Sequence, residues 1–174
     1  MRKFLLYFFT LILDSLLSFI VFFRPEPVKF NTVTVEGKFS ISVPSYLSKT
    51  DSIDASALLQ YKNEQKQIFV LVYEEADTMN QSLETFFKKF ADDFISRIGR
   101  GNLIKYYPEQ INSHNVFIGN IRGSVNQTGV YYRIAIIEAG NVFYELILGV
   151  SDNSLSSFDT DINGIINSFT LLPS

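Results

Sequence analysis

Residues 129–150 read GVYYRIAIIEAGNVFYELILGV, and this stretch contains two long apolar runs separated by a short turn. We expect strands over 129–138 and 141–150, with Ala139 and Gly140 as a two-residue turn between them. Two apolar runs this close in sequence pair as an antiparallel hairpin. The stretch therefore predicts the centre of an antiparallel sheet.

The two faces of this hairpin are both apolar. With that turn, Ile136 lies opposite Phe143 and Ala135 lies opposite Tyr144. Alternate residues of a strand point to opposite faces, and apolar residues occupy both sets of positions here. We therefore predict a central pair of strands that is covered on both faces of the sheet.

The flanking sequence predicts an α+β fold, with an antiparallel β-sheet flanked by helices. Alternating polar and apolar residues indicate further strands at 32–35, 39–43, 58–61, 67–73, 102–107 and 115–123. Apolar residues at helical spacing predict two helices, at 82–98 and 155–169. The first helix carries an apolar stripe that could line a ligand site but is more typical of a core: Leu83, Phe86, Phe87, Phe90, Phe94 and Ile98.

The N-terminus predicts a membrane anchor. Residues 4–23 read FLLYFFTLILDSLLSFIVFF, which as a helix would span about 30 Å, the thickness of a hydrocarbon core. No small-residue cleavage site follows, so an uncleaved signal anchor is favoured over a cleaved, exported form. Pro25 and Pro27 form a spacer. We divide the chain into an anchor and spacer over 1–27 and an extracytoplasmic domain over 28–174, because Arg2 and Lys3 indicate a cytoplasmic N-terminus.

Composition excludes several classes of function. The net charge is −3 with no basic run, so no nucleic-acid partner is expected. Cysteine is absent, which excludes disulfides and thiol catalysis. His114 lies in a predicted turn without a nucleophile motif, so we expect neither an enzyme nor a cofactor.

Residues 159–164 read DTDING, like the start of a calcium-binding loop. Such a loop requires a glutamate at its twelfth position, which is Thr170 here. The apolar stripe through Ile162, Ile165 and Ile166 instead indicates a helix, with Asp159, Asp161 and Asn163 facing solvent. We therefore predict no metal site.

One group of residues suggests a ligand-binding surface. Several tyrosines and two arginines come from segments that are neighbours in the predicted sheet, and tyrosine is common in ligand grooves and interfaces. Ordinary half-buried strand tyrosines are the alternative interpretation. The candidate ligand-binding residues are Tyr106, Tyr107, Arg122, Tyr131, Arg133 and Tyr144.

The order of these elements resembles PsbP-like domains of the bacterial exported type, a superfamily shared with a Ran-binding nuclear-import factor. The resemblance covers about residues 30–172, and its clearest marks are ISVP at 41–44 and IINSF at 165–169. It implies an α/β/α sandwich and a non-enzymatic adaptor or envelope protein. No functional residue is carried over.

Two hypotheses follow. The first is a non-catalytic, membrane-anchored envelope protein that binds or scaffolds another envelope or membrane protein. The alternative is a small-ligand or lipid-binding domain that uses the Tyr-rich sheet face.

Overall fold

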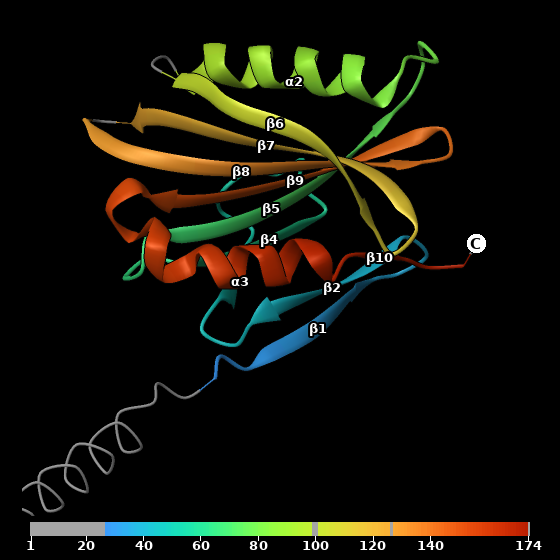
Figure 1. The fold of residues 1–174 in the computed structure, drawn as a ribbon. Coiled ribbons are helices and arrows are strands. Elements are labelled where there is room, and N and C mark those ends of the chain that lie inside the picture. Colours follow the sequence, from blue (N-terminus) through green and yellow to red (C-terminus); the bar gives the residue numbers. More distant parts are fainter. Residues whose placement is uncertain (1–26, 99–100, 126, 174) are drawn as a thin grey trace, which may run out of the picture.

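A computed structural model of the chain describes residues 27–98, 101–125 and 127–173. The described chain has an α+β fold with two antiparallel sheets and two α-helices (Figure 1). The α+β class and the antiparallel strand pairing predicted from the sequence are therefore confirmed.

Seven strands form the larger sheet, in the order β3-β4-β5-β9-β8-β7-β6, and every neighbouring pair is antiparallel. Strands β8 and β9 are the predicted central hairpin, and both are largely buried. The bounds are β3 Ser48–Lys49, β4 Leu59–Asn63, β5 Ile68–Ala76, β6 Gly101–Ile111, β7 His114–Val125, β8 Thr128–Ala139 and β9 Val142–Ser151.

The predicted register of this hairpin is wrong by two residues. Ala139 pairs with Val142, so the turn residues are Gly140 and Asn141. Gly140 has φ +66°, which a two-residue turn with glycine at its first central position requires. A shift of two residues keeps every side chain on its predicted face.

A second sheet was not predicted. It contains β1 (Phe30–Val35), β2 (Phe39–Pro44) and β10 (Thr170–Leu171) in the order β1-β2-β10. The sequence predicted the first two strands, but a two-residue strand has no detectable periodicity. The segments at the two ends of the described chain thus meet on β2.

Each face of the larger sheet is covered by one helix (Figure 1). Helix α2 (Leu83–Ile98) packs on one face, while α3 (Leu155–Asn167) and the small sheet pack on the other. The short 3₁₀ turn η1 (Asp152–Ser154) precedes α3. The sheet therefore separates two hydrophobic cores, one facing each helix.

Two predicted boundaries differ from the structure. Strand β6 continues through Pro108, because β6 is an edge strand and one of its sides needs no backbone donor. Helix α3 ends at Asn167, and Phe169 stacks on Phe39 with ring centroids 4.9 Å apart.

The predicted membrane-spanning helix over residues 4–23 lies outside the described residues. In the part of the chain that the structure describes, no helix is long and apolar enough to cross a membrane.

Candidate functional site

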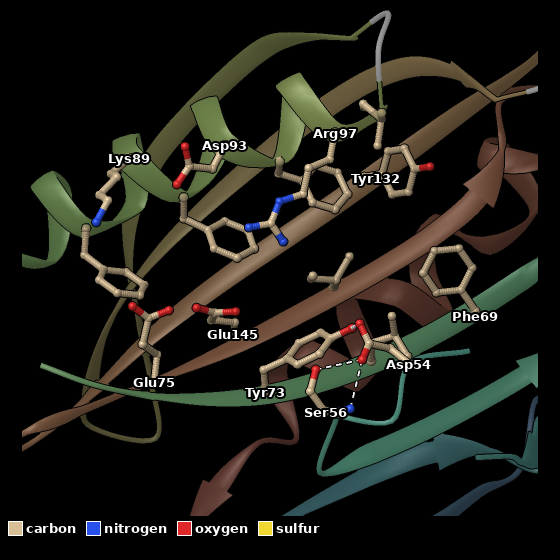
Figure 2. Close-up of a pocket in the computed structure, with 16 residues that line it drawn as sticks. Asp54, Ser56, Phe69, Tyr73, Glu75, Lys89, Asp93, Arg97, Tyr132 and Glu145 are labelled. Carbon is tan, nitrogen blue, oxygen red and sulfur yellow. Dashed lines mark hydrogen bonds between the residues drawn. The ribbon is translucent and has the colours of Figure 1, made fainter. Parts of the chain in front are cut away.

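A pocket of about 430 Å³ lies between α2, from Phe86 to Ile98, and the larger sheet (Figure 2). Helix α2 forms its roof, strands β5, β8 and β9 form its floor, and the loop before β4 forms one wall. Its apolar lining consists mainly of Phe69, Leu71, Phe86, Phe90, Phe94, Ile98, Tyr132 and Ile147.

The pocket exists because the two halves of α2 pack differently. In the N-terminal half, Phe86 stacks on Phe143 at 4.1 Å and Phe87 is completely buried. From the middle of the helix onward, Phe90 and Phe94 are only half-buried and line the pocket. The Phe stripe is therefore core at one end and pocket roof at the other.

Phe69, which lines the pocket, packs directly on a glycine of β9. The Phe69 ring lies over Gly149 so closely that a Cβ on Gly149 would overlap the ring. Phe69 also makes an edge contact with Tyr132 at 6.2 Å. Close backbone approach of this kind requires glycine in the strand.

Glu145 is the most unusual residue of the pocket. It lies in the middle of β9, between Tyr73 of β5 and Ile136 of β8, and it is only 6% exposed. Its Oε1 atom has no hydrogen-bond partner in the described chain. Burial, together with the neighbouring carboxylate of Glu75, raises the pKa of Glu145 to about 8 (Figure 2). Glu145 is therefore mainly protonated at neutral pH.

The wall of the pocket is held by a buried glutamine. Gln60 is 6% exposed, and its Oε1 accepts hydrogen bonds from the backbone N–H groups of Ile53 and Asp54, both at 3.0 Å. Asp54 in turn accepts hydrogen bonds from Ser56 Oγ at 2.7 Å and from Tyr73 OH at 3.2 Å. The Ser56 hydrogen bonds hold the pKa of Asp54 below its usual value.

The charged lining is predominantly acidic. Four carboxylates and two basic side chains line the pocket: Asp54, Glu75, Asp93 and Glu145, with Lys89 and Arg97. A second, more open groove continues from the pocket and shares Phe69 and Tyr132 with it. The site thus combines an aromatic interior with acidic groups.

The structure separates the six candidate residues predicted from the sequence. Tyr106 lies on the α2 face, where it stacks on Phe87 at 5.6 Å. The other five lie on the opposite, α3-facing side of the sheet: Tyr107, Arg122, Tyr131, Arg133 and Tyr144.

Arg133 and Tyr131 are covered by α3. Arg133 is 8% exposed, and its guanidinium donates to Asn120 Oδ1 at 3.1 Å, Tyr131 OH at 3.0 Å and Asn163 Oδ1 at 2.5 Å. It also lies 2.9 Å from Asp159 Oδ1. Every arm of the guanidinium therefore contacts the protein itself.

Arg122 and Tyr144, which also lie on the α3 side of the sheet, each contact an acidic side chain. Arg122 lies 2.9 Å from Asp152 Oδ1 in η1. Burial, followed by the hydrogen bond to Glu74, raises the pKa of Tyr144 to about 12.

The DTDING segment lies within α3, so the predicted helix is confirmed. The expectation that its oxygen-bearing side chains face solvent is wrong for Asp161, which is 8% exposed and accepts a hydrogen bond from Tyr46 OH at 2.7 Å. Asp159 and Asn163 contact Arg133. Among the described residues, no group of three or more acidic, histidine or cysteine side chains is arranged to hold a metal ion.

Sequence reasoning missed the pocket. Glu145 was a detectable signal, because it is an acid in the centre of the apolar run 141–150. The approach of Glu75 to Glu145 depends on the β5–β9 register, which the sequence did not predict.

Known structures of similar shape support the fold. Cyanobacterial PsbP (CyanoP) from Synechocystis sp. PCC 6803 matches with TM-score 0.65 and 9% identity, covering 86% of this chain and 95% of that protein. The Ran-binding protein Mog1p of Saccharomyces cerevisiae matches with TM-score 0.62 and 11% identity, covering 83% and 96%.

The chain has the PsbP-like/Mog1 fold. LpqN, which is involved in cell envelope biogenesis of Mycobacterium tuberculosis, shares this fold with TM-score 0.57 and 12% identity, covering 84% of this chain and 92% of LpqN. No protein-family profile and no curated protein sequence matches this chain. The predicted resemblance to PsbP-like domains is thus confirmed at the level of fold.

Proposed function

We propose that this chain is a non-catalytic binding protein of the cell envelope, and that it holds a small amphipathic ligand in the pocket beneath α2. The observation that carries this proposal is the pocket itself. Its volume of about 430 Å³ lies within the usual range for small-molecule sites. An apolar interior with a few converging polar groups is the usual lining of such sites.

The packing around the pocket supports a permanent binding space. Phe86 and Phe87 fix the N-terminal half of α2 on the sheet, and Gln60 fixes the wall loop. A preformed pocket loses less conformational entropy on binding than one that must open first. The roof, floor and wall are therefore held apart by contacts that do not involve a ligand.

The cellular location is part of the proposal. Residues 4–23 would anchor the chain in a membrane, with the folded domain outside the cytoplasm, and cleavage and export are the alternative. The length and apolarity of this segment support the anchor. The involvement of LpqN in cell envelope biogenesis supports the envelope.

Two tryptophan variants of α2 test the binding site. Asp92 and Asp93 are both exposed on α2, but only Asp93 lines the pocket. We expect Asp93→Trp to fill the pocket and Asp92→Trp to leave it open. Native mass spectrometry of the full chain, released from membranes in mild detergent, should show an organic adduct on the wild type and on Asp92→Trp, but not on Asp93→Trp. An adduct retained equally by both variants would contradict this site.

Binding to another envelope or membrane protein is the second candidate function. The edge strand β6 favours it, because Ile104 is 47% exposed and Tyr106 is 38% exposed on a strand with one open side. The Ran-binding role of Mog1p gives a precedent for protein binding on this fold. Co-purification of one defined membrane protein, lost in Ile104→Lys and kept in Val125→Lys, would support it. Equal loss in both variants would count against β6.

A further inference from the structure

We propose that the pocket is selective for an organic cation, a primary amine with an apolar body, and that Glu145 binds its ammonium group. This inference rests on the proposed ligand-binding function and names the chemical class of the ligand. It joins two independent observations: a buried acceptor without a donor, and an aromatic enclosure with an acidic lining.

The first observation is the unused acceptor. Glu145 is more than nine-tenths buried, it lines the pocket, and its Oε1 has no partner in the described chain. Buried polar atoms are nearly always hydrogen-bonded, because an unsatisfied one loses its water partners without replacing them. A ligand N–H group placed in the pocket would supply the missing donor. An ammonium would also offset the charge of the carboxylate.

The second observation is the composition of the surrounding lining. Rings of Phe90, Phe94 and Tyr132 line the same space as Glu145. The face of an aromatic ring attracts cations within about 6 Å of its centre. The same rings provide the apolar surface that an alkyl or aryl body requires. The pocket therefore offers ring faces to the ammonium group and apolar surface to the body of an amphipathic amine.

The balance of charge favours a cation over an anion. Strand β5 contributes Glu75 and Tyr73, and β8 contributes only the apolar Ile136 opposite Glu145. The charged groups that face Glu145 from the other elements are Lys89, Asp93 and Arg97 of α2 and Asp54 of the wall. Lys89 and Arg97 are exposed, and so are the acids Asp54, Glu75 and Asp93, so the only buried group of this set is the carboxyl of Glu145. A bound cation favours ionisation of this carboxyl, whereas a bound anion would have no buried basic partner in this set.

Binding of such a cation is linked to a proton. The free site holds a proton on Glu145 at neutral pH, since burial and Glu75 raise its pKa to about 8. The ammonium favours the ionised carboxylate, so binding releases this proton to solvent. Affinity for the amine should therefore rise by up to tenfold per pH unit from pH 6 to pH 8, and then level off.

Three small probes of similar shape test the charge preference. They are 2-phenylethylammonium, 2-phenylethanol and 3-phenylpropanoate, and calorimetry of the full chain in lipid nanodiscs measures their binding at pH 6.5. We expect the cation to bind at least tenfold more tightly than the alcohol, and the anion to bind most weakly. Repeating the titration in two buffers of different ionisation enthalpy should show release of nearly one proton per amine bound.

Two matched variants locate the effect. Glu145→Gln keeps the shape of the side chain but removes the group that ionises when the amine binds, so the preference for the amine and the proton release should both disappear while alcohol binding remains. Glu74→Gln makes the same substitution on the opposite face of β5, where Glu74 pairs with Lys38 at 2.6 Å. This control should keep the preference.

The outcomes separate this inference from the proposed function. If the amine and the alcohol bind equally, or if Glu145→Gln keeps the preference, cation selectivity is wrong although the pocket still binds ligands. If none of the three probes binds the wild type, both the inference and the proposed ligand site are overturned.

Discussion

The guanidinium of Arg133 lies 2.9 Å from the carboxylate of Asp159 and thereby ties β8 to α3. The two partners differ in exposure, because Arg133 is 10% exposed and Asp159 is 49% exposed in their side chains. Arg133 Nε also donates a hydrogen bond to Oδ1 of Asn120, which is 3% exposed. The network therefore depends more on the arginine than on the aspartate.

Substitution at these two positions should have unequal effects on stability. Arg133→Met leaves the buried Asn120 without its donor and should lower the free energy of unfolding by about 3 kcal/mol. Asp159→Asn removes only a half-exposed, solvent-screened charge and should cost less than about 1 kcal/mol. Urea unfolding followed by circular dichroism measures both values. Equal losses would contradict the idea that Arg133 is the centre of the network.

Glu145 should make the fold less stable as pH rises. Its pKa is about 8 in the folded state and near 4.5 when the chain is unfolded, so the folded state binds the proton more tightly. Stability from this group is complete below about pH 4.5 and is lost as pH rises toward 8. Glu145→Gln should remove this dependence and stabilise the chain by about 2 kcal/mol at pH 8. A pH series of thermal unfolding, with Glu74→Gln as the control, measures the slope.

Two glycines beneath aromatic rings should differ in their tolerance of alanine. A Cβ on Gly119 would overlap Phe87, which is completely buried, and a Cβ on Gly149 would overlap Phe69, which is half-buried. Phe87 has no free space in which to move, so Gly119→Ala should cost about 3 kcal/mol. Gly149→Ala should cost about 1 kcal/mol, because Phe69 can turn toward the pocket. The reverse order in urea unfolding would show that Phe69 is the more rigid ring.

The turn between β6 and β7 should stabilise the end of α3. Asn112 has φ +49°, and its side-chain amide donates to the carbonyl oxygens of Phe169 at 2.7 Å and Asn167 at 3.3 Å and to Thr170 Oγ1 at 3.2 Å. Asn112→Gly loses these hydrogen bonds and should cost about 1 kcal/mol. Asn112→Ala loses the same hydrogen bonds but keeps a Cβ in the left-handed region, which alanine tolerates less well than asparagine, so it should cost about 1 kcal/mol more than the glycine variant. If the two variants are equally stable, the backbone conformation of the turn contributes nothing.

The elements could be predicted from the sequence because local periodicity determines them. The hairpin at 129–150, the helix at 82–98 and the helix through DTDING all follow from apolar spacing, and the structure contains all three. The resemblance to PsbP-like domains, based on short motifs near Pro44 and Phe169, also led to the correct fold.

The candidate site could not be predicted, because it depends on contacts between distant segments. Tyr131 and Arg133 were identified as a binding surface, yet α3 covers both of them. Helical spacing predicts that Asp161 faces solvent. In the structure Asp161 is buried, and Tyr46, from a loop that is distant in sequence, donates a hydrogen bond to its carboxylate. The pocket requires the β5–β9 register and the position of α2, neither of which has a local signal.

The central position of β9 has a consequence for the synthesis of the chain. This strand lies between β5 and β8 in the sheet, although it is the last strand of that sheet in sequence. The sheet cannot close before residue 151 is available, and β2 cannot be paired on both sides before residue 171 is available. Nearly the whole domain must therefore leave the ribosome before it folds. If the chain is exported, as we propose, this strand order lets it cross a membrane in its unfolded state and complete its core only after the crossing.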